Sequence, residues 1–241
     1  MPIIFFVISF FSSLIGSICG IGGGVIIKPV LDAVGVMSVS AVSFLSGCTV
    51  LSMSIISVFK ALRGGTAKIN TKLTTWLALG SVFGGVIGKV LFQYIKMAFI
   101  YTLKKSQIET HKYENKILCF VIGVILGVCS SFLGIGGGPI NLVILIYFFS
   151  MGTKEAAINS IYIILFSQIA SLVQSIIKQT IPDVELMFLV IMVLGGVLGG
   201  MAGGIVNKKI SEEKVDKLFL GLMGVIILIN IYNAYIFAIT K

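Results

Sequence analysis

The sequence predicts an all-α polytopic membrane protein built from two homologous repeats. The chain is strongly apolar, with 57% hydrophobic and 11% charged residues and a mean hydropathy of +1.11. Charges this sparse cannot cover the surface of a soluble globule. The motif Gly-Ile-Gly-Gly-Gly also occurs twice, at residues 20–24 and 134–138, each time inside a long apolar stretch. We call these two motifs the first and the second glycine break.

The first half divides into three apolar segments, at residues 3–31, 39–59 and 73–103. A helix needs about 20 apolar residues to cross a ~30 Å hydrocarbon core, and each segment reaches that length. The first segment is interrupted at the first glycine break. We expect a second interruption near Pro29, because proline lacks the N–H that a helix interior uses.

The second half repeats this plan with four apolar segments, at residues 117–149, 156–177, 186–206 and 218–238. The segments predict about seven or eight membrane crossings in total. We assign residues 1–104 to a first membrane repeat, 105–116 to a cytoplasmic linker and 117–241 to a second membrane repeat.

Each broken segment is either one kinked helix or a helical hairpin that enters and leaves on the same side. The loops at residues 60–72, 104–116 and 207–217 are rich in lysine, which places them in the cytoplasm by the positive-inside rule. With this placement the two broken segments enter from opposite faces, and the repeats are inverted. Segment 73–103 must then cross twice or dip, although it is shorter than the roughly 40 residues of two full crossings.

The glycine breaks are the candidate substrate site. Broken backbone inside a membrane is tolerated only where it is buried or lines a cavity. A helix that starts after such a break directs its N–H groups and the positive end of its dipole inward, which suits a small anion. Two glycine-interrupted segments in corresponding positions are typical of transporter binding sites between repeats.

We therefore predict a substrate-binding set around the two breaks. It comprises Ser17, Gly20, Gly22, Gly23, Gly24, Lys28, Ser131, Gly134, Gly136, Gly137, Gly138, Asn141, Asn159 and Gln168. Lys28 either neutralises the anion or extends to the membrane interface. Asn159 and Gln168 are expensive to bury in a membrane and are candidates for lining the path. Ser43, Ser46, Ser160 and Ser167 are further polar residues within the spans, and Ser43 and Ser46 are interpreted as structural.

Other glycines have three- and four-residue spacings that favour close helix packing over binding. They are Gly84, Gly85, Gly88, Gly195, Gly196, Gly199, Gly200, Gly203 and Gly204.

Several functional classes are excluded. The net charge of +9 lies mostly in short loops that flank apolar segments, which is not the pattern of a nucleic-acid module. The four cysteines form no C-x-x-C pair and there is one histidine, so no metal site or cofactor is expected. No catalytic triad, carboxylate pair or phosphate-binding loop can be assembled, and we predict that the chain is not an enzyme.

On the two glycine breaks, the Arg63-Gly64-Gly65 loop and the glycine helices at 84–88 and 195–199, the chain resembles the TauE/SafE family, also called TSUP. The resemblance spans nearly the whole chain. It implies a membrane carrier for sulfite, sulfonate-derived or other organosulfur anions, or related carboxylates. One departure from the family pattern is that only residues 97–103 remain apolar after Lys96, where the family has a full span.

The sequence therefore predicts a multi-pass secondary transporter of a small anion in the cell membrane, working by alternating access. The alternatives are a passive anion channel and a transmembrane scaffold or subunit of a larger complex. The expected partners are the anion, the lipid bilayer and, where transport is proton-coupled, protons carried on the substrate. Nucleic acid is excluded, and homo-oligomerisation is left open.

Overall fold

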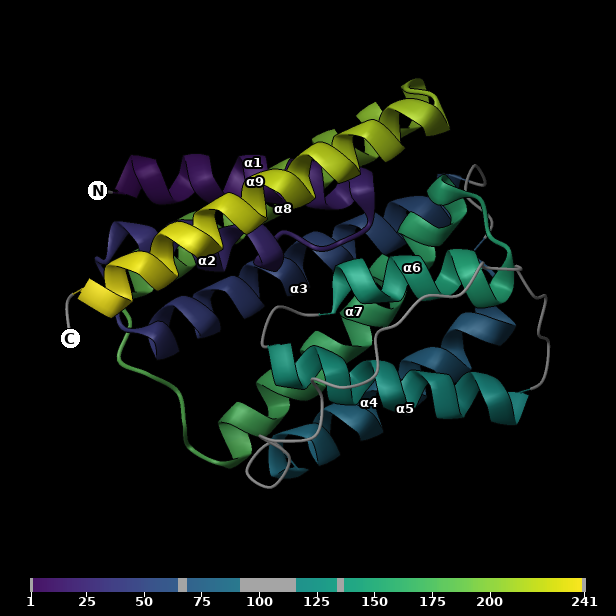
Figure 1. Ribbon diagram of the computed structural model, residues 1–241, viewed down its shortest axis with the longest axis horizontal. Coiled ribbons are helices and arrows are strands. Elements are labelled where there is room, and N and C mark those ends of the chain that lie inside the picture. Colours follow the sequence, from purple (N-terminus) through teal and green to yellow (C-terminus); the bar gives the residue numbers. More distant parts are fainter. Residues whose placement is uncertain (1, 65–68, 92–115, 134–136, 240–241) are drawn as a thin grey trace.

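The computed structural model describes residues 2–64, 69–91, 116–133 and 137–239, and every regular element in these ranges is a helix (Figure 1). The helices are α1 (Pro2–Cys19), α2 (Gly24–Val34), α3 (Val39–Gly64), α4 (Thr71–Leu91), α5 (Lys116–Leu133), α6 (Gly138–Phe149), α7 (Thr153–Ile177), α8 (Leu186–Lys209) and α9 (Glu212–Ile239).

Among the described residues, five helices are long and apolar enough to cross a membrane, namely α1, α3, α7, α8 and α9. Two shorter apolar helices join them, Leu73–Gly84 within α4 and the whole of α6. This confirms the prediction of an all-α polytopic membrane protein. That the two halves are homologous repeats stays a prediction.

The distribution of side chains is that of a protein dissolved in lipid. Large apolar side chains face outward, for example Ile3 at 78% exposed and Leu186 at 72%. Small hydroxyl side chains are buried instead, including Ser9, Ser13 and Thr49 at 0% exposed. Lipid tails solvate leucine as well as a protein interior does, so polar and small residues gather between the helices.

The glycine-rich faces of α8 and α4 bring helices into backbone contact. A Cβ atom at Gly199 would collide with the carbonyl of Phe10 on α1, and one at Gly84 would collide with Val124 on α5. Gly196 and Gly200 face α3 in the same way. The packing interpretation of these glycines is confirmed, except at Gly204, where nothing lies within 4 Å of an added Cβ. The side chains of residues 85–90 lie outside the described part.

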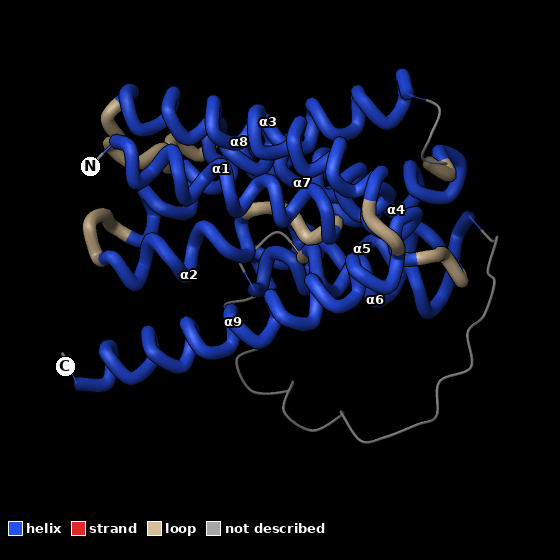
Figure 2. The backbone as a smooth tube through the Cα atoms, turned by 90° about the horizontal axis from the view of Figure 1, so that it is seen from above, coloured by secondary structure: helices blue, strands red, loops and turns tan. Residues whose placement is uncertain are grey.

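Both broken segments are helical hairpins. Phe5 near the start of α1 and Leu31 near the end of α2 belong to one buried cluster, whereas Gly16 lies against the turn at Gly22 and Gly23. The helices α1 and α2 are therefore antiparallel neighbours, as Figure 2 also shows.

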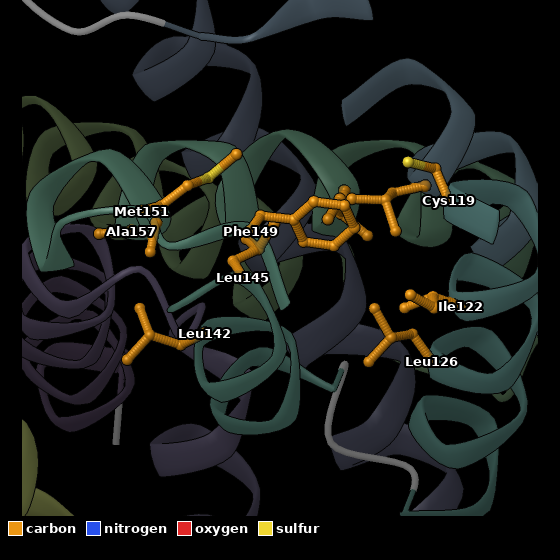
Figure 3. Packing of buried hydrophobic residues seen from close by; sticks show 11 residues of the cluster. Cys119, Ile122, Leu126, Leu142, Leu145, Phe149, Met151 and Ala157 are labelled. Carbon is orange, nitrogen blue, oxygen red and sulfur yellow. The ribbon is translucent and has the colours of Figure 1, made fainter. Parts of the chain in front are cut away.

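In the second hairpin, α5 and α6 are also antiparallel. Cys119 near the start of α5 lies at the same end as Phe149 of α6, and Leu126 lies at the other end with Leu142 (Figure 3).

The hairpins open toward opposite ends of the bundle. The first one meets the start of α3 through Val42, and the second meets the start of α7 through Met151 and Ala156. The helices α3 and α7 run in opposite directions, because Gly47 faces Gln168 and Leu172 while Val50 and Ile164 both contact Gly22. The starts of α3 and α7, and with them the open ends of the hairpins, therefore lie at opposite ends.

The expected second break near Pro29 is wrong. Pro29 lies inside α2, which continues to Val34. The φ angle of proline is compatible with a helix, so only one backbone hydrogen bond is lost. The helix is held in place from outside by the Asn233 side chain of α9, which donates a hydrogen bond to the Pro29 carbonyl at 3.0 Å.

Two of the basic loops are shorter than expected. Helix α3 includes Lys60 and Arg63, and α8 continues to Lys209, which leaves two residues between α8 and α9. Long basic side chains extend from a helix end toward water, so charge alone does not end a helix. The end of segment 73–103 beyond Leu91 and the linker at 105–116, apart from Lys116 at the start of α5, lie outside the described residues.

Gly203 and Gly204 of α8 provide a matched pair of variants for the packing of α1. A Cβ at Gly203 would collide with the Leu14 carbonyl and the Ser17 side chain, whereas the position at Gly204 is open. We expect Gly203→Ala to lower the free energy of unfolding by about 1–3 kcal/mol through overpacking. Gly204→Ala should leave it unchanged or raise it by up to about 1 kcal/mol. Thermal unfolding in detergent measures both, and equal effects would contradict the α1–α8 backbone contact.

Candidate functional site

The first glycine break is a tight turn that only glycine fits. Gly20 and Gly22 have φ angles of +74° and +73°, in the left-handed region that disfavours other residues. The N–H of Ile21 donates to the carbonyl of Gly16 at 3.1 Å, which closes the end of α1. Gly16 itself packs on the backbone of Gly22 and Gly23.

This turn lies between the middles of α3 and α7. A Cβ at Gly20 would collide with the backbone of Ala157, and one at Gly22 would lie 3.3 Å from Ile164 and 3.5 Å from Val50. A Cβ at Gly24 would lie 3.2 Å from the Ser46 hydroxyl. Residues of α3 and α7 thus surround the turn that leads into α2.

The second glycine break meets the first. Gly137 has a φ of +67°, and Pro139 occupies the first turn of α6, where its missing N–H has no helical partner to lose. A Cβ at Gly138 would collide with the backbone of Ile21. The start of α6 therefore touches the turn that begins α2. Gly134 and Gly136 lie outside the described residues.

The beginnings of α2 and α6 are buried and have no side-chain caps. Gly23 and Gly137 are the N-cap residues, and neither has a side chain that could cap its helix. All six residues from Gly20 to Val25 are buried, as are Gly137 and Gly138. The first N–H groups of a helix have no acceptor within the helix, so a buried and uncapped start needs another partner. Two such starts in contact form a site that attracts negative charge.

The other predicted residues on α1 and α2 lie around this junction. Ser17 bonds to the Ser57 hydroxyl at 3.2 Å and donates to the Gly200 carbonyl at 3.3 Å, so it links α1 to α3 and α8. Lys28 is half-buried one turn beyond Gly24 and one turn before Asp32.

Of the predicted residues on the second hairpin, Asn141 lies in the first turn of α6 with its side chain 3% exposed. Ser131 is part of α5, and its side chain lies outside the described part.

The contacts shown for Asn159 and Gln168 are with α4, α3 and the helix α7 to which they belong. The Asn159 side-chain oxygen accepts hydrogen bonds from the Thr74 hydroxyl and from the N–H of Asn70 at 3.2 Å. Its amide donates to the Glu155 carbonyl at 2.8 Å. Asn159 therefore ties α7 to α4. Gln168 lies further along α7, against Gly47 of α3.

Sequence reasoning left Ser46 and Ser160 out of the site. Both are buried, at 1% and 0% exposed. Ser13, Ser54 and Ser160 have buried hydroxyls with no hydrogen-bond partner among the described residues. Ser46 and Ser160 were visible in the sequence as polar residues within spans, but the sequence alone does not give the side of the helix that each occupies.

Comparison with known proteins identifies the family. The model of the sulfite exporter TauE/SafE family matches residues 5–230. The chain belongs to the TauE/SafE family. A probable membrane transporter protein of Methanocaldococcus jannaschii is 27% identical over 249 residues, which cover 91% of each chain. No solved structure gives a significant match. The chain is thus a multi-pass membrane transporter of the TauE/SafE family, as its sequence motifs indicated.

Gly20 and Gly35 test the packing of the first break in this TauE/SafE protein. Both have positive φ angles, but an added Cβ meets nothing at Gly35 and collides with Ala157 at Gly20. We expect Gly35→Ala to lower the free energy of unfolding by about 1–2 kcal/mol, the cost of the left-handed conformation alone. Gly20→Ala should lower the free energy of unfolding by clearly more, because the added Cβ also collides with Ala157. Similar losses in thermal unfolding would argue against the contact with α7.

Asn159→Leu tests whether the Asn159 amide holds helices together. The change leaves the Thr74 hydroxyl and the Asn70 N–H without their acceptor, and we expect a loss of about 2–4 kcal/mol in the free energy of unfolding. The control is Asn230→Leu. Among the described residues, the Asn230 amide donates to the Ile226 carbonyl of its own helix at 2.9 Å, so this change should alter stability by less than about 0.5 kcal/mol. An Asn159→Leu protein of normal stability that fails to transport would instead place Asn159 in the substrate path.

Proposed function

We propose that this TauE/SafE protein is a secondary transporter that carries a small anion of the sulfite or organosulfur class across the cell membrane by alternating access. The proposal places the substrate between the two glycine breaks. The observation that carries it is the contact of Gly138 at the start of α6 with Ile21 just before α2, at two buried and uncapped helix starts.

The electrostatics of this junction favour an anion over a cation. Each helix start contributes a partial positive charge of roughly half an elementary charge and several N–H donors. Lys28 adds a positive charge one turn further along α2. The residues in contact with Gly20, Gly22 and Gly24 are Ala157, Ile164, Val50 and Ser46, which offer no carboxylate to a metal cation.

The pairing of helices supports the prediction of inverted repeats. The hairpin α1–α2 precedes the long helices α3 and α4, as α5–α6 precedes α7 and α8. In this comparison, α1 corresponds to α5 and α4 corresponds to α8. The contact of α1 with α8 therefore corresponds to that of α5 with α4, and the structure contains both contacts. The contact of α3 with α8 similarly corresponds to that of α7 with α4. Hairpins of opposite orientation that meet near the middle of the bundle suit a carrier that exposes one site alternately to either side.

The substrate class rests on the family. Its description names sulfite export, and the archaeal relative is described as a probable membrane transporter. Sulfite is a small oxyanion whose oxygens accept hydrogen bonds, which matches a site built from N–H and hydroxyl donors. Energy comes from ion gradients in this proposal, and a coupled proton travels on the substrate.

Gly23→Leu and Gly137→Leu test the site. Leucine at Gly23 would press on the backbone of Ser12 and Ser13, and leucine at Gly137 would force a side chain into a φ of +67°. We expect both variants to insert in the membrane but to lose at least about 90% of sulfite flux, because the helix starts are displaced by more than the ~1 Å that positioning tolerates. The measurement is uptake of labelled sulfite into proteoliposomes, with and without a proton gradient and with sulfate, thiosulfate, sulfoacetate and acetate as competitors.

The control is Gly204→Leu, because nothing lies within 4 Å of a Cβ atom added at Gly204. It should retain wild-type flux. Unchanged flux in both break variants would refute the site, and the absence of flux with folded wild-type protein would refute sulfite as the substrate.

A further inference from the structure

Ser160 has a buried hydroxyl that the fold leaves unused. The residue is 0% exposed, and its oxygen has no hydrogen-bond partner among the described residues. A buried hydroxyl without a partner destabilises a protein by about 1–3 kcal/mol. Ser160 lies in the first half of α7, and a bound ligand would supply the hydrogen-bond partner that its hydroxyl lacks there.

The helical phase of α7 gives the direction of this hydroxyl. Ala157 and Ile164 lie on the side that contacts Gly20 and Gly22. Ala156 and Ile163 lie on the neighbouring side, within the cluster that contains α5 and α6. At about 100° per residue, Ser160 lies between these two sides. It is thus directed to the place where α6 begins against the first glycine break.

Ser46 occupies the matching position on α3. The distance along the sequence from Ser46 to Ser160 equals that from Gly24 to Gly138 and from Val50 to Ile164. Val50 and Ile164, one turn after the two serines, contact Gly22 together. The Ser46 hydroxyl itself lies 3.2 Å from where a Cβ of Gly24 would be. Each half of the chain therefore supplies one buried serine: Ser46 lies beside the start of α2, and the helical phase of α7 directs Ser160 toward the start of α6.

We propose that Ser46 and Ser160 form a pair of hydroxyl donors that bind an oxyanion between the starts of α2 and α6. Each hydroxyl donates one hydrogen bond to an anion oxygen, and the backbone N–H groups at the two helix starts donate the others. This inference rests on the proposed anion transport and names the side chains that would contact the substrate. It assigns a binding role to two residues that helix packing does not explain.

The test uses Ser46→Ala, Ser160→Ala and the double variant of the full chain, with Ser81→Ala as the matched control. Ser81 is also buried, at 2% exposed, but it donates to the Ala78 carbonyl at 2.8 Å, on α4. The probe is labelled sulfite, measured as the KM of uptake into proteoliposomes and as the sulfite-dependent shift of the unfolding temperature in detergent.

We expect each single variant to raise KM about tenfold or more, since a hydrogen bond to a charged ligand is lost, and the double variant to raise it further. The shift of the unfolding temperature by sulfite should shrink in parallel. Without sulfite, Ser160→Ala should be as stable as the wild type or more stable, because no protein group loses a partner. Ser81→Ala should keep the wild-type KM.

The outcomes separate this inference from the proposed function. Wild-type flux that is blocked by the glycine-break variants, together with an unchanged KM in the double serine variant, would overturn the serine pair and leave anion transport standing. A folded wild type with neither sulfite flux nor a sulfite-dependent shift would overturn both. Should an alanine variant fail to fold, Ser→Cys at the same position leaves no cavity, keeps a weaker donor and should raise KM by a smaller factor.

Discussion

The structure depends on backbone touching backbone at one place, between the long helices α3 and α7. Gly138 lies on the backbone of Ile21, and Gly20 lies on that of Ala157, at distances that no Cβ atom would allow. These contacts bring two half-length helices to a common point with their N–H groups toward each other. The local fold and the proposed attraction for an anion therefore have the same cause, which is the absence of side chains at the two breaks.

The membrane explains why glycine and serine, and not large apolar residues, hold this interior together. Burial of leucine gains little when the surrounding solvent is itself hydrocarbon, so close packing and hydrogen bonds must contribute more. The glycine faces of α8 and α4 provide the close packing, and Asn159 and Ser17 provide hydrogen bonds between helices. The same rule makes any unpaired hydroxyl conspicuous, as at Ser160.

Hydropathy and repetition were sufficient to predict the membrane class, the broken segments and the family, because these properties follow from the order of residues. The glycine breaks were found for the same reason. The contacts of single polar residues were not predictable, since they depend on helix rotation. Asn159 faces α4, and Ser46 lies beside Gly24. The break predicted at Pro29 was wrong because proline removes one helical hydrogen bond but does not by itself end a helix. Contacts with other helices, such as the hydrogen bond from Asn233, are not visible in the sequence.

The pairing of helices does not follow the division of the chain into two halves. Helix α8 of the second half packs on α1 and α3, and α4 of the first half packs on α5 and α7. The helices thus form two packed bodies, one of α1, α3 and α8 and the other of α4, α5 and α7. Each body contains one helix from the other half of the chain. The connection at residues 178–185, between α7 and α8, passes from one body to the other. In the proposed alternating-access cycle, a rotation of one body against the other would bend the chain at this connection between α7 and α8.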